Sequence, residues 1–422
     1  MIGYDAARQR ILAACEPLAA ETVAVAAALD RVLASDVVSG EDLPPFDNTA
    51  MDGFALATGG RELASGDEFA VAGSRAAGDD EACYDAGDAC EIMTGASLPA
   101  GFDAVLPVEQ ATVLTRDADA RPTRIRLDAA VLPGAHVRRR GQDVAAGTHV
   151  LAAGMRITPA ARMLLAALGV ANVAVRPQVP VALLTTGCEL VDDPHQPLAP
   201  GQIRNSNGPY LSDRLDQAGA MVVHRETVLD DPAEFVTALA RSLDAGAKVV
   251  VSTGAVSMGR HDFVPDALRA LGAEIVFHKV AIRPGKPLLF ARLPGGQLYF
   301  GLPGNPVSSA VGLRFFVEPA LRALLGLAPE RPLQLPLAAP AHKKVGFRFL
   351  QKARVVVTGQ GQLQVQLLAG QESFRIQPLL AANAWAVLDE DVAQLPAGTL
   401  VEVHGLDGHG LLLSNFEDFD GH

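Results

Sequence analysis

A regular alternation of strand and helix patterns between residues 179 and 325 constrains the fold more than any other feature. Residues 179–184 form an uninterrupted apolar run that ends in Thr-Thr-Gly, which is typical of a buried strand followed by a loop. Residues 231–234 (Asp-Pro-Ala-Glu) carry the signals of a helix start, and Gly246 ends the apolar periodicity that follows. Strands that alternate with helices predict βαβ units, and therefore a mostly parallel sheet with helices on both faces.

Four loops follow strands of this predicted sheet, and each is polar or rich in glycine. Ligands of such sheets bind beyond the carboxyl ends of the strands, where these loops meet. We therefore expect one binding site at this edge of the sheet. The four loops are residues 185–189, 230–231, 253–262 and 303–306.

The composition argues against several classes of function. The 422-residue chain has 35 Lys and Arg against 48 Asp and Glu, so its formal net charge is −13, which argues against general binding to nucleic acid or to an anionic membrane surface. No apolar run reaches the ~20 residues of a membrane-spanning helix. The cysteines at 15, 83, 90 and 188 form no Cys-x-x-Cys pair, and a reducing cytoplasm is the expected location.

The regions on either side of the alternating segment have other patterns. Residues 327–422 show short alternating strands among Pro and Gly, which predicts a small β barrel. Residues 45–143 are also rich in turns and short strands, and we expect a second β-dominated domain there. Residues 1–44 are expected to be mostly helical, and Thr158-Pro159 predicts another helix start.

Two loops of the α/β segment carry residue types that bind anions. In TGAVSMGRHDF (253–263), glycines such as Gly254 would let backbone amides approach a phosphate, although a plain turn is the commoner explanation. Asp262 in the same loop is either a metal ligand or a helix cap. In RPGKP (283–287), two prolines stiffen a turn that holds Arg283 and Lys286 together. Two cations held in this way suit an oxyanion, and a solvated turn is the alternative.

Other segments carry weaker signals. GLPGNPVSS (301–309) opens a helix with Asn305 and Ser308, which suits either an anion or a simple cap. Glu189 could bind Mg²⁺ together with another carboxylate. The polar runs FDNTAMDGFA and HVRRRGQDV lack the period of a helix or strand, so they suit functional loops, with turn-forming residues and a solvated face as the alternatives.

Taken together, these segments resemble the molybdopterin molybdenumtransferase family, MoeA, and its eukaryotic counterpart, the E domain of gephyrin. Each matching segment alone is modest evidence, but seven in the family's order, spread over nearly the whole chain, are specific. They are FDNTAMDGFA (46–55), IMTGASLPAGFDAVLPVE (92–109), RRRGQDV (138–144), TTGCEL (185–190), the loop ending at Asp262, RPGKP (283–287) and GLPGNPVS (301–308).

The resemblance implies a multidomain fold of α/β and β type. Members of the family are homodimers, and their active cleft lies between the third domain of one subunit and the second domain of the other. Contacts with other enzymes of molybdenum cofactor synthesis are also expected. The implied domains are an elongated N-terminal domain (1–44 and 144–177), an inserted β-rich domain (45–143), a central α/β/α molybdopterin-binding domain with a mostly parallel sheet (178–326) and a C-terminal β barrel (327–422).

The reaction that the resemblance implies uses two substrates, molybdate and adenylylated molybdopterin. Molybdenum is inserted and AMP is released with Mg²⁺, and positive groups are needed where negative charge develops. Glu189 and Asp262 would be the metal ligands. The other matching catalytic positions are Asp52, Thr94, Arg138, Asp143, Asp230 and Lys279, the first four from the inserted domain. The matching substrate-binding positions are Gly254, Arg283, Lys286, Pro303, Gly304, Asn305, Ser308 and Ser373.

The chain departs from the family's pattern at several positions. Cys188 stands where an aspartate is usual, Ala255 lies in a loop usually richer in glycine, and Arg204-Asn205 replaces a tyrosine-aspartate pair. A cation from FLQKARV is expected at the site, and it is either Lys352 or Arg354.

Two alternative functions stay open at this point. One is a molybdopterin adenylyltransferase, whose fold would resemble residues 178–326 alone. The other is a non-catalytic scaffold of the gephyrin E type. A preference for tungsten over molybdenum is open as well.

Overall fold

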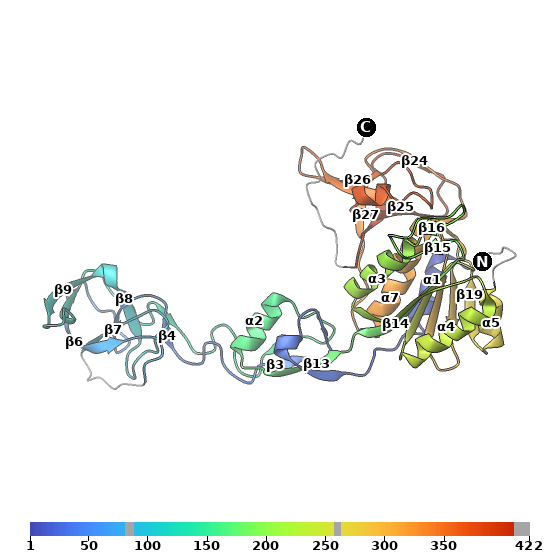
Figure 1. The fold of residues 1–422 in the computed structure, drawn as a ribbon. Helices are drawn as coiled ribbons and strands as arrows, with labels where there is room; N and C mark the ends of the chain where they lie inside the picture. The colour runs from blue at the N-terminus through green and yellow to red at the C-terminus, as the bar shows by residue number, and fades with distance from the viewer. Residues whose placement is uncertain (81–87, 257–262, 409–422) are drawn as a thin grey trace.

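The chain forms an elongated arm that ends in a larger body. The computed structural model describes residues 1–80, 88–256 and 263–408. Figure 1 shows strands β6 (Glu68–Arg75) and β9 (Ala111–Arg116) at the far end of the arm and helix α2 (Pro159–Ala167) along it, whereas the N-terminus and the C-terminal strands lie with the body. Within the described ranges, no helix is both long and apolar enough to span a membrane.

A six-stranded sheet forms the centre of the body, in the order β17-β14-β18-β22-β21-β19. The first four strands are parallel, as predicted, but β21 and β19 are antiparallel to their neighbours, so the sheet is mixed. Because only five residues join β21 to β22, this connection is too short for the crossover that a parallel pair needs. The bounds are β14 (Val179–Thr186), β17 (Ala220–Val228), β18 (Val249–Thr253), β19 (Glu274–His278), β21 (Leu289–Arg292) and β22 (Leu298–Leu302).

Helices cover both faces of this sheet. Val181 and Leu183 of β14 belong to one apolar core with α1, α3, α6 and α7, and the alternate residues Ala182 and Leu184 belong to a second core with α4 and α5. This two-sided burial explains why the strand is apolar throughout rather than alternating. The bounds are α1 (Tyr4–Leu12), α3 (Asn207–Gln217), α4 (Pro232–Asp244), α5 (Val264–Ala270), α6 (Pro306–Gly312) and α7 (Glu318–Leu324).

Two of the predicted helix caps form, and a third does not. The carboxylate of Asp231 accepts hydrogen bonds from the amides of Ala233 and Glu234 at the start of α4. Thr158 accepts one from the amide of Ala161 in α2. Asn305 precedes α6, but its side chain makes no capping bond. A five-residue π segment (Leu313–Val317) joins α6 directly to α7, so one continuous helical stretch runs from Pro306 to Leu324.

The middle of the arm is built from strands that precede the inserted β-rich unit in the sequence and strands that follow it. β1 (Glu21–Ala24) and β2 (Val32–Leu33) both pair with β13 (Asn172–Arg176), and β3 (Val37–Val38) pairs with β12 (His149–Leu151). The prediction that residues 1–44 are mostly helical is therefore wrong. The partners of these strands lie more than 100 residues later in the chain, and a local pattern does not show them.

The far end of the arm is a β-rich unit. Its sheet has the order β8-β5-β7-β6-β10-β9, packed around Phe54, Leu106 and Ile125. A separate two-stranded ladder joins β4 to β11. The further bounds are β4 (Asn48–Thr49), β5 (Gly53–Leu56), β7 (Ala89–Ile92), β8 (Ala104–Pro107), β10 (Pro122–Leu127) and β11 (Val137–Arg138).

The C-terminal part is a mostly antiparallel sheet attached to the body. The short strand β20 (Ile282–Arg283), which comes from the body, extends this sheet by parallel pairing with β25. A single bridge between Leu337, which follows β23, and Val365 of β26 brings these two edges of the sheet together. A closed barrel stays a prediction. The bounds are β23 (Leu333–Pro336), β25 (Arg348–Val357), β26 (Leu363–Leu367), α8 (Pro378–Ala381), β27 (Ala384–Leu388) and β29 (Leu400–Gly405), with β24 (Ala341–His342) pairing β28 (Gln394–Leu395).

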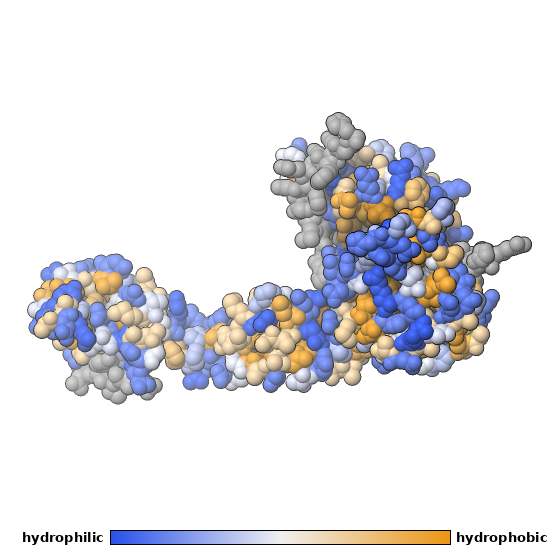
Figure 2. Space-filling view, in the orientation of Figure 1, coloured by the Kyte–Doolittle hydropathy of each residue, from blue (hydrophilic) through white to orange (hydrophobic). Residues whose placement is uncertain are grey.

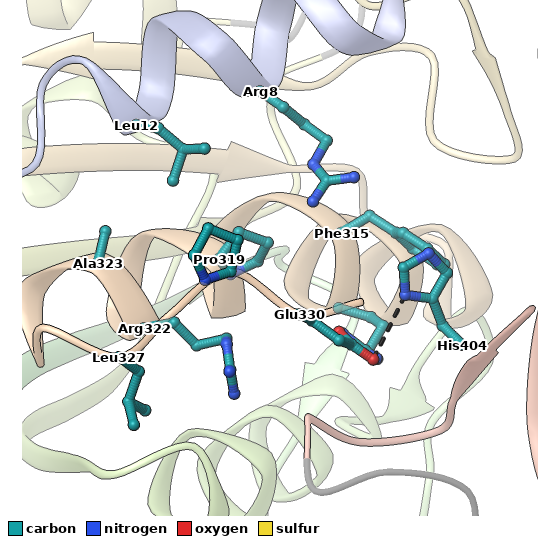
Figure 3. A pocket seen from close by; sticks show the side chains of 11 residues that line it. Arg8, Leu12, Phe315, Pro319, Arg322, Ala323, Leu327, Glu330 and His404 are labelled. Carbon is teal, nitrogen blue, oxygen red and sulfur yellow. Dashed lines mark hydrogen bonds and ion pairs between the residues drawn. The ribbon is translucent and has the colours of Figure 1, made fainter. Parts of the chain in front are cut away.

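Buried charges also join the C-terminal sheet to the body. Figure 3 shows Glu330 and His404 facing each other beside α7. Arg314 donates to Glu330 at 2.6 Å and to the carbonyl oxygen of Gly405 at 3.0 Å, and the His404 Nε2 lies 2.6 Å from Glu402. Arg314 and His404 are almost fully buried, so these contacts fix the junction between the two parts.

Candidate functional site

Two adjoining cavities lie at the carboxyl ends of the parallel strands. One, of about 960 Å³, lies between the body and the C-terminal sheet. The other, of about 640 Å³, is lined by the loops that follow β14, β18 and β22. Pro287, Asn305 and Phe374 line both cavities. The described parts of three of the four predicted loops thus meet in one place.

The larger cavity is rich in cations. Arg283, Lys286, Lys343 and Lys344 line it, against Glu372 as the one acidic lining residue within the described ranges. The chain as a whole carries a net charge of −13, so this local excess of positive charge is opposite to the overall balance. Such a cavity favours an anionic ligand.

Hydroxyl groups lie in the same cavity. Ser308, in the first turn of α6, is 4% exposed, and Ser373 of the C-terminal part also lines the cavity. The amide of Val307 donates to the carbonyl oxygen of Ser373 at 3.0 Å, which ties the two parts together here. Arg283, Lys286, Asn305, Ser308 and Ser373, all predicted substrate-binding residues, are thus brought together.

The smaller cavity contains the described start of the glycine loop. Gly254 has a φ of +88°, and a Cβ atom there would lie 2.5 Å from the Thr186 hydroxyl oxygen and 2.7 Å from the Thr186 carbonyl oxygen. Only glycine fits this position without strain. Pro303, Gly304 and Glu189 line the same cavity.

A group of three potential ligands lies beside this cavity. Cys188, Glu189 and Asp230 offer ligand atoms that all lie within 4.8 Å of one another, and the amide of Cys188 donates to Asp230 at 3.4 Å. Two carboxylates suit Mg²⁺, whereas a thiol is a soft ligand that Mg²⁺ does not favour. The carboxylates therefore fit a hard cation, with Cys188 outside the set. Asp262, the other predicted metal ligand, lies outside the described residues.

Asn205 is a further functional candidate. The sequence analysis noted it only as a departure from the family's tyrosine-aspartate pair. Its buried amide group donates to the hydroxyls of Thr185 at 2.9 Å and Thr227 at 3.1 Å and to Asp192 at 2.9 Å. Its oxygen accepts from the amide of Gly208 at 2.9 Å. Asn205 thus links β14, β17 and α3 at the wall of the smaller cavity, which it lines.

In the inserted unit, one predicted pair is joined by hydrogen bonds. The amide and the hydroxyl of Thr94 both donate to the carboxylate of Asp52, each at 2.7 Å. These bonds, first from the Thr94 amide and then from its hydroxyl, lower the pKa of Asp52 below its usual range. Asp52 is exposed and ionised near neutral pH, so it is available to a ligand.

The three consecutive arginines at 138–140 make different contacts. Arg139 donates to Asp47 at 2.6 Å and Arg140 to Asp42 at 2.5 Å, so these two stabilise the loop. Arg138, in β11, has no ion pair with a carboxylate in the described part of the chain. Asp143 is exposed nearby, with its amide bonded to the carbonyl oxygen of Leu43.

Within one chain, the predicted site residues fall into two distant groups. Figure 1 places β4 and β7, which flank Asp52 and Thr94, at the far end of the arm from β14 and the cavities. Lys279 precedes β20 and has a φ of +76°, but it does not line either cavity. The structure therefore gathers the residues of the body and the C-terminal part, and leaves the inserted unit apart from them.

The C-terminal contribution differs from the expected one. Lys352 is fully buried and donates to the carbonyl oxygen of Arg375 at 3.2 Å, while Arg354 donates to that of Ala381, and neither lines the two cavities. Phe347 and Phe349 line the larger cavity instead. No local signal in the sequence pointed to them, because their contacts are with another part of the chain.

Comparison with known families covers most of the chain. Residues 2–169 match the MoeA N-terminal region (domain I and II), and residues 182–323 match a probable molybdopterin binding domain. Residues 334–406 match the MoeA C-terminal region (domain IV).

Individual relatives match over their full length. The molybdopterin molybdenumtransferase of Synechococcus elongatus is 40% identical over 414 residues, which is 96% of this chain and 100% of that protein. The one from Haemophilus influenzae is 33% identical over 96% of this chain and 98% of its own. A crystal structure of the molybdopterin biosynthesis moeA protein from Pyrococcus horikoshii superposes with a TM-score of 0.79 at 25% identity, over 96% of this chain and 99% of that one. The chain belongs to the molybdopterin molybdenumtransferase family.

Proposed function

We propose that this chain is the transferase of molybdenum cofactor biosynthesis that inserts molybdenum from molybdate into adenylylated molybdopterin and releases AMP. One observation carries the proposal: a cation-lined cavity adjoins a glycine-loop cavity that has carboxylates beside it. A tetrahedral oxyanion suits the first cavity, and the nucleotide-bearing phosphates suit the second. The full-length relatives that carry the molybdenumtransferase name support this choice.

Each part of the site has a distinct task in this reaction. Arg283, Lys286 and the hydroxyls of Ser308 and Ser373 would bind the oxygens of molybdate. Gly254 would let the backbone approach the phosphates. Asn205 would hold the loops in position through its buried hydrogen bonds.

Mg²⁺ is part of the proposal. Glu189 would hold it, with Asp230 beside it and Asp262 as the further predicted ligand. When bound, Mg²⁺ would neutralise charge on the phosphoanhydride that is cleaved. The protein's own carboxylates repel one another without a cation, which favours the metal.

We also propose that the active form is a homodimer. Asp52, Thr94, Arg138 and Asp143 lie too far along the arm to reach the cavities of their own chain (Figure 1). A second chain would bring its inserted unit to the cleft. Figure 2 shows apolar side chains on the arm, and Met155 and Met163 are 45% and 73% exposed there, as expected for a surface that a partner covers. A cytoplasmic location fits this role.

The experiment that tests the function compares two reactions. Purified protein is incubated with adenylylated molybdopterin, molybdate and Mg²⁺, and AMP is followed by chromatography. We expect molybdate-dependent AMP release that a chelator of Mg²⁺ stops. The adenylyltransferase alternative predicts pyrophosphate release from ATP and free molybdopterin instead, and the scaffold alternative predicts neither product.

A further inference from the structure

Two aromatic rings of the C-terminal part lie against the cations of the larger cavity. The Arg283 guanidinium carbon is 5.7 Å from the ring centre of Phe349, and the Lys286 ammonium nitrogen is 5.8 Å from that of Phe347. The Lys343 ammonium nitrogen lies 5.3 Å from the Phe349 ring as well. These distances are within the range of cation–π attraction.

The backbone explains why the rings meet these cations. β20 and β25 pair in parallel, and Arg283 is the register partner of Phe349. Phe347 lies in the bend just before β25, two positions before Phe349, and both side chains line the larger cavity. The segment that holds Arg283 and Lys286 is thus docked on the C-terminal part at the point where the rings are presented.

The rings hold the cations without neutralising them. Arg283 and Lys286 have like charges three residues apart, and in the described part of the chain neither makes an ion pair with a carboxylate. Both cations remain exposed to solvent at the cavity, where a ligand can reach them. A carboxylate would fix them but would also cancel the positive charge that an anion needs, whereas the face of an aromatic ring attracts a cation and leaves its charge intact.

We infer that Phe347 and Phe349 are positioning residues for the oxyanion, acting through Lys286 and Arg283. This inference rests on the proposed function, which assigns those two cations to molybdate. It makes the C-terminal part a component of the anion site through aromatic side chains rather than through Lys352 or Arg354.

The test measures molybdate binding to the full-length protein by calorimetry, so that it does not depend on turnover. Phe349→Leu and Phe347→Leu keep an apolar side chain of similar reach but lose the aromatic face. Because both cations are exposed, we expect each variant to weaken molybdate binding by about two- to fivefold. Phe349→Tyr and Phe347→Tyr keep the face, and we expect them to bind molybdate as tightly as the parent.

Two controls separate the possible failures. Phe374→Leu removes an exposed ring from the same cavity, and no cation lies over that ring in the described ranges, so molybdate binding should not change. Arg283→Ala and Lys286→Ala test the underlying assignment. If they leave binding unchanged, the proposed anion site is wrong. If they weaken it and the two Leu variants do not, or if the Tyr variants lose as much as the Leu variants, the positioning role is wrong.

In the activity assay, the same variants should raise the KM for molybdate and leave kcat near the parent value at saturation. A purely structural defect would lower kcat in proportion to the fraction of folded protein. A fall in kcat with an unchanged KM would also overturn the inference.

Discussion

Arg283 and Lys286 are the residues on which molybdate binding is expected to depend. They line one cavity with Ser308 and Ser373, and charged hydrogen bonds of this kind contribute ~1.5–3 kcal/mol each. Changing either cation to Ala should therefore raise the molybdate concentration needed for half-maximal AMP release by about ten- to a hundredfold. Steady-state kinetics at varied molybdate checks this. An unchanged molybdate dependence in both variants would assign RPGKP to a structural turn.

Gly254 is a position where a single methyl group should be costly. Its φ is +88°, and an added Cβ would lie 2.5 Å from the Thr186 hydroxyl oxygen. We expect Gly254→Ala to lower the free energy of unfolding by about 1–3 kcal/mol. Denaturant unfolding measures this loss. Gly304→Ala is the matched control in the same cavity, because a Cβ there would have its nearest contact, Gly254 Cα, at 3.8 Å, and it should change stability little.

At the level of single elements, the N-terminal cap of α4 is expected to contribute measurably to the free energy of unfolding. Asp231 accepts hydrogen bonds from the amides of Ala233 and Glu234 at 2.8 and 2.9 Å. Asp231→Ala should lower the free energy of unfolding by about 1 kcal/mol, and Asp231→Asn, which still caps, should lower it much less. Denaturant midpoints of the two variants provide the comparison. Equal losses would mean that the charge of Asp231, and not its cap, stabilises the helix.

The same helix shows what local sequence can predict. The cap, the proline at the first position and the apolar period of α4 are all contained in about fifteen residues, and the structure confirms the element. The strands β1 and β2 could not be predicted in this way, because β13, their partner, comes more than 100 residues later. The helix after Asn305 was predictable as an element, but the π segment in its middle was not, because nothing in the local period signals one.

Residues of the candidate site could be predicted from the sequence where they lie at strand ends or in recognisable motifs. Glu189, Gly254, Arg283 and Ser308 fall into this group, and they line the two cavities. Asn205 and Phe349 do not, because their roles come from contacts between segments that are distant in the sequence. Such contacts are properties of the tertiary fold, and a single sequence does not display them.

At the scale of the whole molecule, the junction between body and C-terminal sheet should respond to pH. Burial alone would raise the pKa of Glu330, but His404 and Arg314 lower it to about 2. Burial alone would lower the pKa of His404, but its two neighbouring carboxylates, Glu330 and Glu402, raise it. The stability due to Glu330 is therefore present above its ordinary pKa of 4.5 and is lost as pH falls from 4.5 toward 2, whereas that due to His404 is lost as pH rises through its raised pKa.

Glu330→Gln tests this junction. The shift of Glu330 corresponds to about 3 kcal/mol at neutral pH, so the variant should unfold more easily at pH 7 and lose less additional stability between pH 5 and pH 3 than the parent does. Thermal unfolding across this pH range measures both effects. Parallel pH profiles for parent and variant would exclude Glu330 as the group responsible.

The separation of the site residues into two groups leads to the most direct test of the shared cleft. Asp52→Ala damages the inserted unit and Lys286→Ala damages the cavity of the body, and at a molybdate concentration near the parent's half-maximal value each variant alone should release little AMP. In a mixed dimer, one of the two clefts would combine an intact inserted unit with an intact body. AMP release by the mixed variants after subunit exchange is the deciding measurement. We expect substantial recovery of activity, and no recovery with exchange verified by mass spectrometry would exclude a cleft shared between two chains.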